Sequence, residues 1–312
     1  MFDLRHPTRP RLICLGLSAF DVTWVVESLP SGGGKTRALD LREGGGGMAA
    51  NASVAAAKLG AQVQFWGRAG QDSAGRSMHQ GLAALGVDVS QFRLFDGARS
   101  SVSGIIVDAN GERAIVNFRG ADLPDDPAWL PLDAVAQADA VLADPRWPEG
   151  ALALFQTAQA HQVATVLDGD VAEAPVFDAL LPFVDCAVFS EPALAGYATQ
   201  AGDVEAQLHF ARSRGCALAA VTLGERGVVW VDATGTHRLP ALKVDAVDTT
   251  GAGDVFHGAF AFALGAQVPL REAFQFSSVV AALKCRHAGG REGVPDLATA
   301  LSSLQRFKEL SA

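Results

Sequence analysis

Apolar residues along the chain fall into two alternating patterns. Short, nearly continuous apolar runs have the length and composition of strands that are buried on both faces of a sheet. They lie at residues 11–17, 62–66, 140–143, 163–167, 186–189, 218–222 and 228–231. Between them, helical spacing of apolar residues occurs at 49–59, 73–85, 150–161, 204–214, 252–264 and 270–287. This alternation predicts an α/β fold with a mainly parallel sheet, helices on both faces and ligands at the carboxyl ends of the strands.

Two stretches interrupt this alternation. Residues 21–41 and 100–118 have alternating or β-rich patterns without helices, and the second contains a hairpin turn signal, Asp108-Ala109-Asn110-Gly111. We expect one small β-sheet that projects from the main body. The predicted organisation is one domain over residues 1–312, with this sheet built from segments at about 21–43 and 97–120.

Composition narrows the classes of protein. The chain has 312 residues, of which 49% are hydrophobic, and a formal net charge of −9. An acidic chain without a basic stripe is a poor partner for nucleic acid. No apolar run is long enough to cross a bilayer, and residues 1–11 lack the apolar core of a signal peptide. We therefore expect no membrane partner and a cytoplasmic location.

One segment has the composition of a phosphoryl-transfer site. An apolar strand pattern is followed by the small-residue turn Gly251-Ala252-Gly253, then by Asp254 and an apolar helix. The turn leaves its N–H groups uncovered at a helix N-terminus, where anions bind. The Asp254 carboxylate would face the same volume and could take a proton from an attacking hydroxyl. These residues predict an anion hole with an adjacent general base.

The longer string around this turn resembles the C-terminal signature of the ribokinase/PfkB family of carbohydrate kinases. It reads Asp248-Thr249-Thr250-Gly251-Ala252-Gly253-Asp254. Residues 44–61 and 67–75, about two hundred positions upstream, resemble the N-terminal signature of the same family. The resemblance covers essentially the whole chain. It implies a ribokinase-like three-layer α/β/α sandwich, a β lid that often forms a homodimer interface, and ATP-dependent phosphorylation of a sugar with Asp254 as catalytic base.

The resemblance also assigns the nucleotide site and the ions. The residues carried over are Ser190, Thr222, Gly224, Gly227, Thr250, Gly251, Gly253, Ala281 and Lys284. ATP and Mg²⁺ are the implied cofactors. Many relatives carry Asn-x-x-Glu where this chain has residues 190–193, so the metal ligands are unknown, with Glu191 or Asp168 acting through water as candidates. A monovalent cation near Asp248 and residues 288–290 stays open.

For the sugar, Asp21 follows the first strand, where relatives bind hydroxyl groups. A carboxylate that accepts two hydroxyl protons is a common sugar contact. Gly46, Gly47 and Asn51 are expected to complete the surface that binds the sugar hydroxyl groups. Lys35, Asn117 and Arg146 lie where the lid and the main sheet should converge. Two cations and an amide suit an anionic group at the far end of the sugar.

The choice of sugar rests on a closer resemblance within the family. Residues 142–147, 165–170, 189–192 and 281–285 look especially like the bacterial kinases of 6-deoxy-6-sulfofructose, which phosphorylate carbon 1. Their sulfonate-binding lysine, asparagine and arginine match Lys35, Asn117 and Arg146. Departures at Asn51 and in the turn 118–120 leave fructokinase, ketohexokinase, ribokinase and 2-keto-3-deoxygluconate kinase open.

Two further classes are weighed against a sugar kinase. A nucleoside kinase of the same family needs an apolar or aromatic slot for a base, whereas Lys35 and Arg146 are charged. A catalytically silent sugar sensor is expected to lose the base or the anion hole, and both are intact here. We therefore expect an enzyme that uses ATP and binds a small-molecule sugar through a primary hydroxyl.

Overall fold

The computed structural model describes residues 9–310. Within that range the main sheet has nine strands. In spatial order they are β13 (Gly235–Leu239), β12 (Val228–Asp232), β11 (Leu218–Thr222), β10 (Cys186–Ser190), β9 (Ala164–Gly169), β8 (Ala140–Ala143), β1 (Arg11–Gly16), β4 (Gln62–Gly70) and β5 (Phe92–Phe95). Neighbouring strands are parallel except where β12 runs against β11 and β13. The predicted mainly parallel sheet is confirmed.

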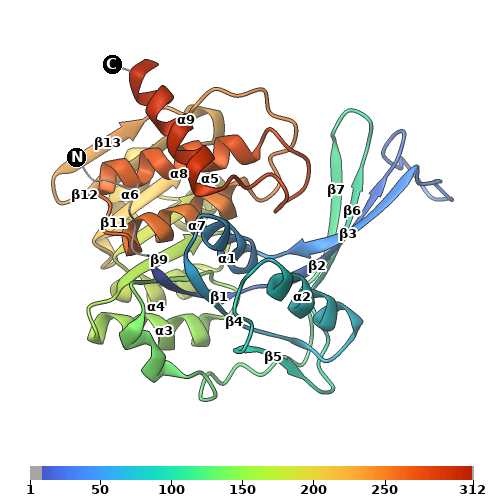
Figure 1. The fold of residues 1–312 in the computed structure, drawn as a ribbon, viewed down its shortest axis with the longest axis horizontal. Coiled ribbons are helices and arrows are strands. Elements are labelled where there is room, and N and C mark those ends of the chain that lie inside the picture. Colours follow the sequence, from blue (N-terminus) through green and yellow to red (C-terminus); the bar gives the residue numbers. More distant parts are fainter. Residues whose placement is uncertain (1–8, 311–312) are drawn as a thin grey trace.

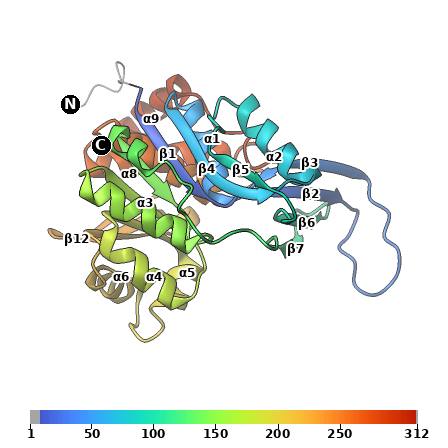
Figure 2. The same cartoon turned by 90° about the horizontal axis from the view of Figure 1, so that it is seen from below.

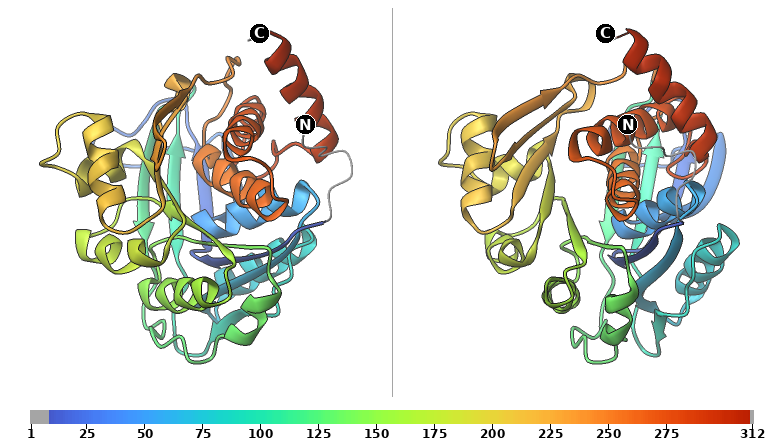
Figure 3. Two further views of the ribbon diagram at one scale, coloured as in Figure 1. Left: turned by 90° about the vertical axis from the view of Figure 1, so that its left-hand side faces the viewer. Right: turned by 60° about the vertical axis from the view of Figure 1, so that its left-hand side comes forward.

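Helices cover both faces of this sheet, as Figures 2 and 3 show. One layer consists of α1 (Met48–Lys58), α2 (Ser73–Ala84), α7 (Ala252–Gly265), α8 (Leu270–Lys284) and α9 (Leu297–Leu310). The other consists of α3 (Pro148–Ala160), α4 (Ala174–Leu180), α5 (Glu191–Tyr197) and α6 (Val204–Ser213). Short 3₁₀ helices are η1 (Leu132–Gln137), η2 (Leu181–Phe183) and η3 (Gly224–Arg226). The arrangement is the predicted three-layer α/β/α sandwich.

Strand alternation divides the interior into two hydrophobic cores. Leu12 and Cys14 of β1 face the layer that contains α7, whereas Ile13 and Leu15 face the layer that contains α3. Helix α7 is buried over all of residues 255–263, which suits its almost wholly apolar sequence. The small-residue turn at its N-terminus is therefore attached to a rigid element. No described helix is both long enough and apolar enough to span a bilayer.

A second sheet, which we call the lid, projects from the main body (Figure 1). Its strands, in spatial order, are β3 (Asp40–Gly46), β2 (Ala19–Val25), β6 (Val102–Val107) and β7 (Arg113–Phe118). The turn at residues 108–111 joins β6 to β7, as its sequence predicts. Residues 26–39, within a stretch predicted as β-rich, instead form a long loop without a strand.

Several elements are missing from the sequence-based prediction. They are β5, β13, α4, α5 and α9. The first four are strands of four or five residues and helices of seven residues, which carry too few apolar repeats to stand out from their surroundings, whereas α9 has 14 residues and its omission has no such reason. Helix α8 ends at Lys284 rather than at 287, and the carbonyl of the next residue, Cys285, accepts hydrogen bonds from the backbone of Val247 and Asp248.

Candidate active site

Two cavities meet at the turn that precedes α7. The first, the lid cavity, has a volume of about 660 Å³ and lies between the lid and the carboxyl ends of β1, β8 and β9. The second, the α7–α8 cavity, has a volume of about 820 Å³ and lies beside η3 and residues 241–246. Thr250, Gly251 and Asp254 line the lid cavity, while Thr249, Ala252 and Gly253 line the other. The turn is thus shared between two binding spaces.

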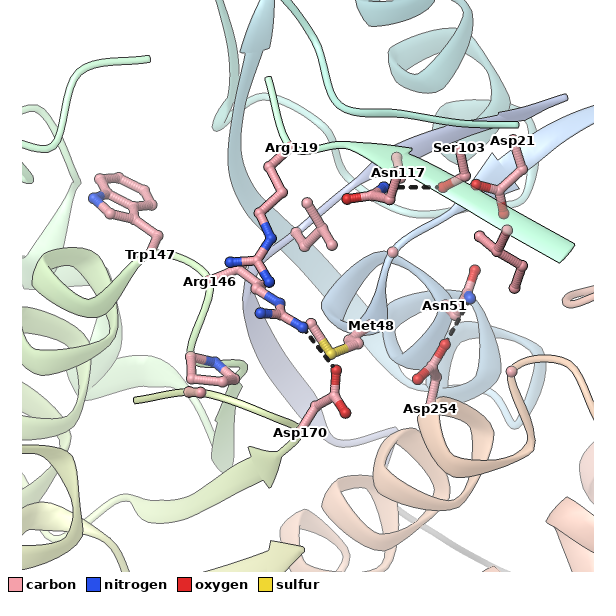
Figure 4. Close-up of a pocket in the computed structure, with 18 of the residues that line it drawn as sticks. Asp21, Met48, Asn51, Ser103, Asn117, Arg119, Arg146, Trp147, Asp170 and Asp254 are labelled. Atoms are coloured by element: carbon pink, nitrogen blue, oxygen red, sulfur yellow. Dashed lines mark hydrogen bonds and ion pairs between the residues drawn. The ribbon is translucent and has the colours of Figure 1, made fainter. Parts of the chain in front are cut away.

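Asp254 lies in the first turn of α7 and faces the lid cavity (Figure 4). The Asn51 Nδ2 donates a hydrogen bond to its Oδ2 at 2.7 Å. Burial raises the pKa of Asp254 to about 6. The Asn51 hydrogen bond and the Arg291 charge oppose this rise, while the Asp170 and Asp144 carboxylates add to it. A carboxylate with this pKa is ionised at neutral pH yet basic enough to accept a proton.

A buried arginine that the sequence analysis missed fixes the amide beside Asp254. The Nε of Arg291 donates to the Oδ1 of Asn51 at 2.7 Å, and its Nη2 donates to the Gly46 carbonyl at 3.0 Å. The Asn51 amide is held between a donor on one side and an acceptor on the other. Arg291 stands in the glycine-rich loop 288–294, where no periodic pattern marks it. Only the fold brings it beside α1.

Three polar side chains form a row on the inner face of the lid. In the strand register, Asp21 pairs with Ser103, and Ser103 pairs with Asn117. The Asn117 Nδ2 donates to the Ser103 Oγ at 3.2 Å, and all three residues line the lid cavity. Burial raises the pKa of Asp21, and the Ser103 hydrogen bond and the Arg291 charge oppose that rise. Ser103 was not predicted, because one serine in an apolar strand carries no signal by itself.

The predicted glycines have separate roles beside this row. A Cβ on Gly46 would lie 2.1 Å from the Asp21 Oδ2, so only glycine leaves room for that carboxylate. Gly47 lines the lid cavity with a φ of 94°, a conformation that side chains rarely adopt. Asp21, Gly47 and Asn51 therefore lie together at the cavity, and Gly46 supports Asp21 from behind.

Cationic side chains lie at another part of the lid cavity. Arg146, from the loop after β8, forms an ion pair with Asp170, with an Nη2–Oδ2 distance of 3.0 Å. Arg119, which follows β7, extends from the lid into the same region (Figure 4). Among the described residues, no ion pair involves Arg119. One of the two guanidinium groups is thus neutralised locally and the other is available to a ligand.

The structure does not bring Lys35 to this cavity. Lys35 is exposed in the loop 26–39, which extends from the ends of β2 and β3 away from the main body (Figure 2). A Cβ added to any of the adjoining glycines at 32–34 would meet no atom within 4 Å, so the loop does not pack back onto the site. Arg119, in the turn that departs from the family pattern, supplies a cation there instead.

Most residues predicted to bind nucleotide line one of the two cavities. Thr222, Gly224, Gly227, Gly253 and Ala281 line the α7–α8 cavity, and Thr250 and Gly251 line the lid cavity. The remaining two residues are outside both linings. The Ser190 Oγ accepts a hydrogen bond from the Ala193 N–H at the start of α5, and the side chain of Lys284 is buried against the loop before the turn.

Neither residue considered for a metal offers an unpaired, solvent-exposed carboxylate. Glu191 forms an ion pair with Arg226, and the Asp168 Oδ2 lies 3.2 Å from the Nδ1 of buried His257. Burial raises the pKa of Asp168 well above its ordinary value, and the nearby Asp254 carboxylate adds to the rise. Within residues 9–306, no three His, Cys, Asp or Glu side chains gather in a way that could hold a metal. These residues do not fit a protein-built Mg²⁺ site.

The lid also touches the loop that leads into the shared turn. The Arg113 Nη2 lies 2.7 Å from the Asp248 Oδ1, and its Nη1 donates to the Thr250 Oγ1. Burial disfavours the Asp248 carboxylate, but hydrogen bonds from Thr250, Gly289 and Arg113 hold its pKa well below the usual range. Asp248 thereby joins the lid to the segment before α7.

A buried carboxylate in the first turn of a helix, with a small-residue turn before it and two cavities that meet there, is an arrangement suited to phosphoryl transfer. The model of the pfkB family carbohydrate kinases matches residues 9–297, and the chain belongs to this family. It is 28% identical over 294 residues to the ribokinase of Staphylococcus aureus, a match that covers 91% of this chain and 96% of the relative. It is thus a ribokinase-like sugar or nucleoside kinase of that family.

Solved structures share the fold. A crystal structure from Agrobacterium tumefaciens, described as a candidate ribokinase, has a TM-score of 0.91 and 35% identity, and covers 97% of this chain and 99% of its own. The Arabidopsis thaliana ribokinase complexed with ribose and ATP has a TM-score of 0.85 at 24% identity, with 96% and 99% coverage. The predicted ribokinase-like fold is therefore confirmed.

Proposed function

We propose that this chain transfers the γ-phosphate of ATP to a primary hydroxyl of a ketose that carries a single negative charge. The first candidate is 6-deoxy-6-sulfofructose, which would give the 1-phosphate. The observation that carries the proposal is the turn 249–254, because it lines both cavities and presents the Asp254 carboxylate to the lid cavity.

The residues of the turn support direct transfer between the two cavities. The nucleotide occupies the α7–α8 cavity with its terminal phosphate at residues 251–253, where the Gly251 and Gly253 N–H groups stabilise the anion, since the Ala252 N–H already donates to the Thr249 carbonyl. The sugar lies under the lid, with Asp21 on its hydroxyls. The attacking hydroxyl oxygen forms a bond to the γ-phosphorus, the bond from that phosphorus to the ADP oxygen breaks, and Asp254 accepts the hydroxyl proton.

The cations of the lid cavity support an anionic acceptor. Arg68 and Arg146 already have Asp125 and Asp170 as partners, so Arg119 is the guanidinium group of this lining that has no ion pair among the described residues. A sulfonate carries one negative charge at neutral pH, and Asn117 adds an amide donor. A carboxylate matches this charge equally well, so 2-keto-3-deoxygluconate is the second candidate. A dianionic phosphate matches it less well, and uncharged sugars such as ribose or fructose leave Arg119 without a partner.

The experiment that tests the substrate is ATP-dependent phosphorylation of a panel by the purified protein. The panel contains sulfofructose, 2-keto-3-deoxygluconate, fructose, fructose 6-phosphate, ribose and adenosine. We expect the highest kcat/KM with a monoanionic sugar. Arg119→Ala should raise KM for that sugar by about 10- to 100-fold, since a hydrogen bond to a charged group contributes about 1.5–3 kcal/mol.

Lys35→Ala is the matched control for Arg119→Ala, because it removes a cation from the lid but outside the cavity. It should leave KM for the monoanionic sugar unchanged. A preference for ribose, fructose or adenosine, together with an unchanged KM in Arg119→Ala, would contradict the proposal of an anionic substrate. The assignment as a kinase would still stand.

The proposal also covers the metal ion, the phosphate donor and the location of the enzyme. A Mg²⁺ ion would be bound by the nucleotide phosphates and water, the usual manner for this ion, because the described residues do not build a cage for it. The ribokinase structure complexed with ribose and ATP supports ATP as the phosphate donor. We place the enzyme in the cytoplasm, where ATP is available, as a single kinase unit over residues 1–312.

We also propose a homodimer through the lid. Strand alternation places Trp24, Leu41, Val116 and Phe118 on the face opposite to Asp21 and Asn117. Val116 is 77% exposed and Leu41 is 55% exposed, so this face is apolar and uncovered. Contiguous exposed apolar surface is typical of an interaction site. Measurement of the mass in solution tests this proposal, and a monomer at all concentrations would contradict it.

A further inference from the structure

Lys284, the last residue of α8, is a buried charge that the proposed transfer step does not use. Its side chain is fully buried. Burial disfavours its ammonium and lowers its pKa, while the neighbouring Asp248 carboxylate opposes that effect. A buried ammonium needs partners to offset the loss of hydration. Those partners identify what the residue does.

The ammonium is bound by main-chain carbonyls of the loop before the shared turn. The Lys284 Nζ donates to the Asp248 carbonyl at 2.9 Å and to the Thr250 carbonyl. Two carbonyl oxygens that point at one small volume repel each other unless a cation lies between them. Backbone carbonyls are also the ligands with which proteins replace the hydration shell of K⁺. Lys284 supplies the cation for this pair from the chain itself.

This contact orients the amide at the start of the anion-binding turn. A trans peptide unit holds its carbonyl and the next N–H on opposite sides. The Thr250 carbonyl faces Lys284, so the Gly251 N–H points away from the ammonium, and Gly251 lines the lid cavity. The first N–H groups of a helix have no partner within the helix and remain free for a ligand. The position of Lys284 thus fixes the direction in which the Gly251 N–H, a donor of the proposed anion hole, points.

The loop is fixed from other directions as well. The Asp248 carboxylate accepts hydrogen bonds from the N–H of Thr250 at 2.8 Å and from that of Gly289 at 3.0 Å. The backbone of Asp248 also donates to the Cys285 carbonyl at 3.0 Å. These contacts hold the outer side of the loop, whereas only the ammonium holds the two converging carbonyls among the described residues.

We propose that Lys284 is a positioning residue whose ammonium takes the place of a monovalent cation, so that this kinase needs no added K⁺ to shape its anion hole. The inference rests on the proposed phosphoryl transfer. It also makes the predicted contact between Lys284 and the nucleotide indirect, because the lysine acts through the turn.

The first test uses the unmodified protein. Phosphorylation is measured at constant ionic strength with K⁺, Na⁺, NH₄⁺ or choline as the monovalent cation. We expect the same kcat and the same KM for ATP in all four salts. Strong activation by K⁺ or NH₄⁺ over choline would overturn the proposal.

The second test replaces the ammonium with an apolar chain of similar length. In choline buffer, Lys284→Met should lower kcat by about 10²-fold, the cost of a misplaced oxyanion-hole donor. Added K⁺ or NH₄⁺ should restore part of the loss, because the free ion can enter between the carbonyls. A folded Lys284→Met variant with full activity in choline would overturn the proposal, as would a loss of activity that no cation restores.

The matched control is Lys58→Met. The Lys58 Nζ also donates to main-chain carbonyls, those of Arg291 at 2.8 Å and Glu292 at 3.3 Å, but on a different loop. Whatever its activity, this variant should gain no response to K⁺ or NH₄⁺. A cation response in Lys58→Met equal to that of Lys284→Met would mean that the effect is unspecific.

A binding measurement separates this inference from the proposed function. Titration calorimetry with the ATP analogue AMP-PNP should show weaker binding to Lys284→Met in choline buffer and recovery in NH₄⁺, with no salt effect on the unmodified protein. If no sugar in the panel is phosphorylated, the proposed function fails, and this titration still decides the role of Lys284. Equal affinities of both proteins in choline would count against it.

Discussion

The two cavities that meet at the turn before α7 differ in the kinds of residue that line them. The lid cavity is lined by charged and polar side chains from distant segments, such as Asp21, Asn117 and Arg146. The α7–α8 cavity is lined mainly by glycine, alanine and apolar side chains, all from segments between residues 222 and 285. Side chains differ from one sequence to another and can suit a new acceptor, whereas main-chain N–H groups are present whatever the side chains are.

This difference explains which properties of the site can be inferred from the family resemblance. The backbone of the shared turn is fixed by small residues and by its attachment to the buried helix α7, so its geometry follows from the motif. The acceptor depends on which side chains the lid brings over the sheet. In this chain Arg119 reaches the cavity and Lys35 does not. Specificity is therefore the less transferable of the two properties.

The largest expected effect comes from the proposed base, which faces the lid cavity from the turn that both cavities share. Asp254→Asn should lower kcat by about 10²–10⁴-fold, because the amide cannot accept the hydroxyl proton. Calorimetric affinities for ADP and for the sugar should stay nearly unchanged, since the amide has the same size. The exposed Asp245→Asn is the matched control and should keep full activity. A folded Asp254→Asn variant with near-normal turnover would contradict its role as base.

A second prediction concerns pH. Asp254 accepts a proton only as a carboxylate, and its pKa is about 6, so kcat/KM should fall as the pH drops below that value. The Asn51 hydrogen bond lowers this pKa. Asn51→Ala should therefore move the acid limb of the profile to higher pH, in addition to any loss of rate. An acid limb that stays in place in this variant would mean that Asp254 does not control it.

The smallest expected effect is confined to the α7–α8 cavity. A Cβ on Gly253 meets no protein atom within 4 Å, so Gly253→Ala should spare the fold and crowd only the bound nucleotide. We expect KM for ATP to rise roughly fivefold, a cost of about 1 kcal/mol, with KM for the sugar unchanged. Gly81→Ala, on α2 with the same open surroundings, is the control. An equal rise in both KM values would remove the distinction between the cavities.

How far the sequence could predict the site depends on where the partners of each residue lie. Gly251, Gly253 and Asp254 were predicted together because one turn carries all three. Ser103 and Arg291 were missed, because each acquires its role from residues on other elements. Lys35 was expected at the cavity, but its loop extends from the far end of β2.

The sequence by itself determined the strand–helix alternation, the two-faced burial of the sheet and the small-residue turn before α7. These features depend on short-range periodicity and on local backbone freedom, which neighbouring residues specify. Only the tertiary structure decided that Arg291 holds Asn51, that Arg119 reaches the lid cavity and that Lys284 holds the loop before the turn. The physical reason is that hydrogen bonds and charges act over a few ångströms in space, whatever the separation of the residues along the chain.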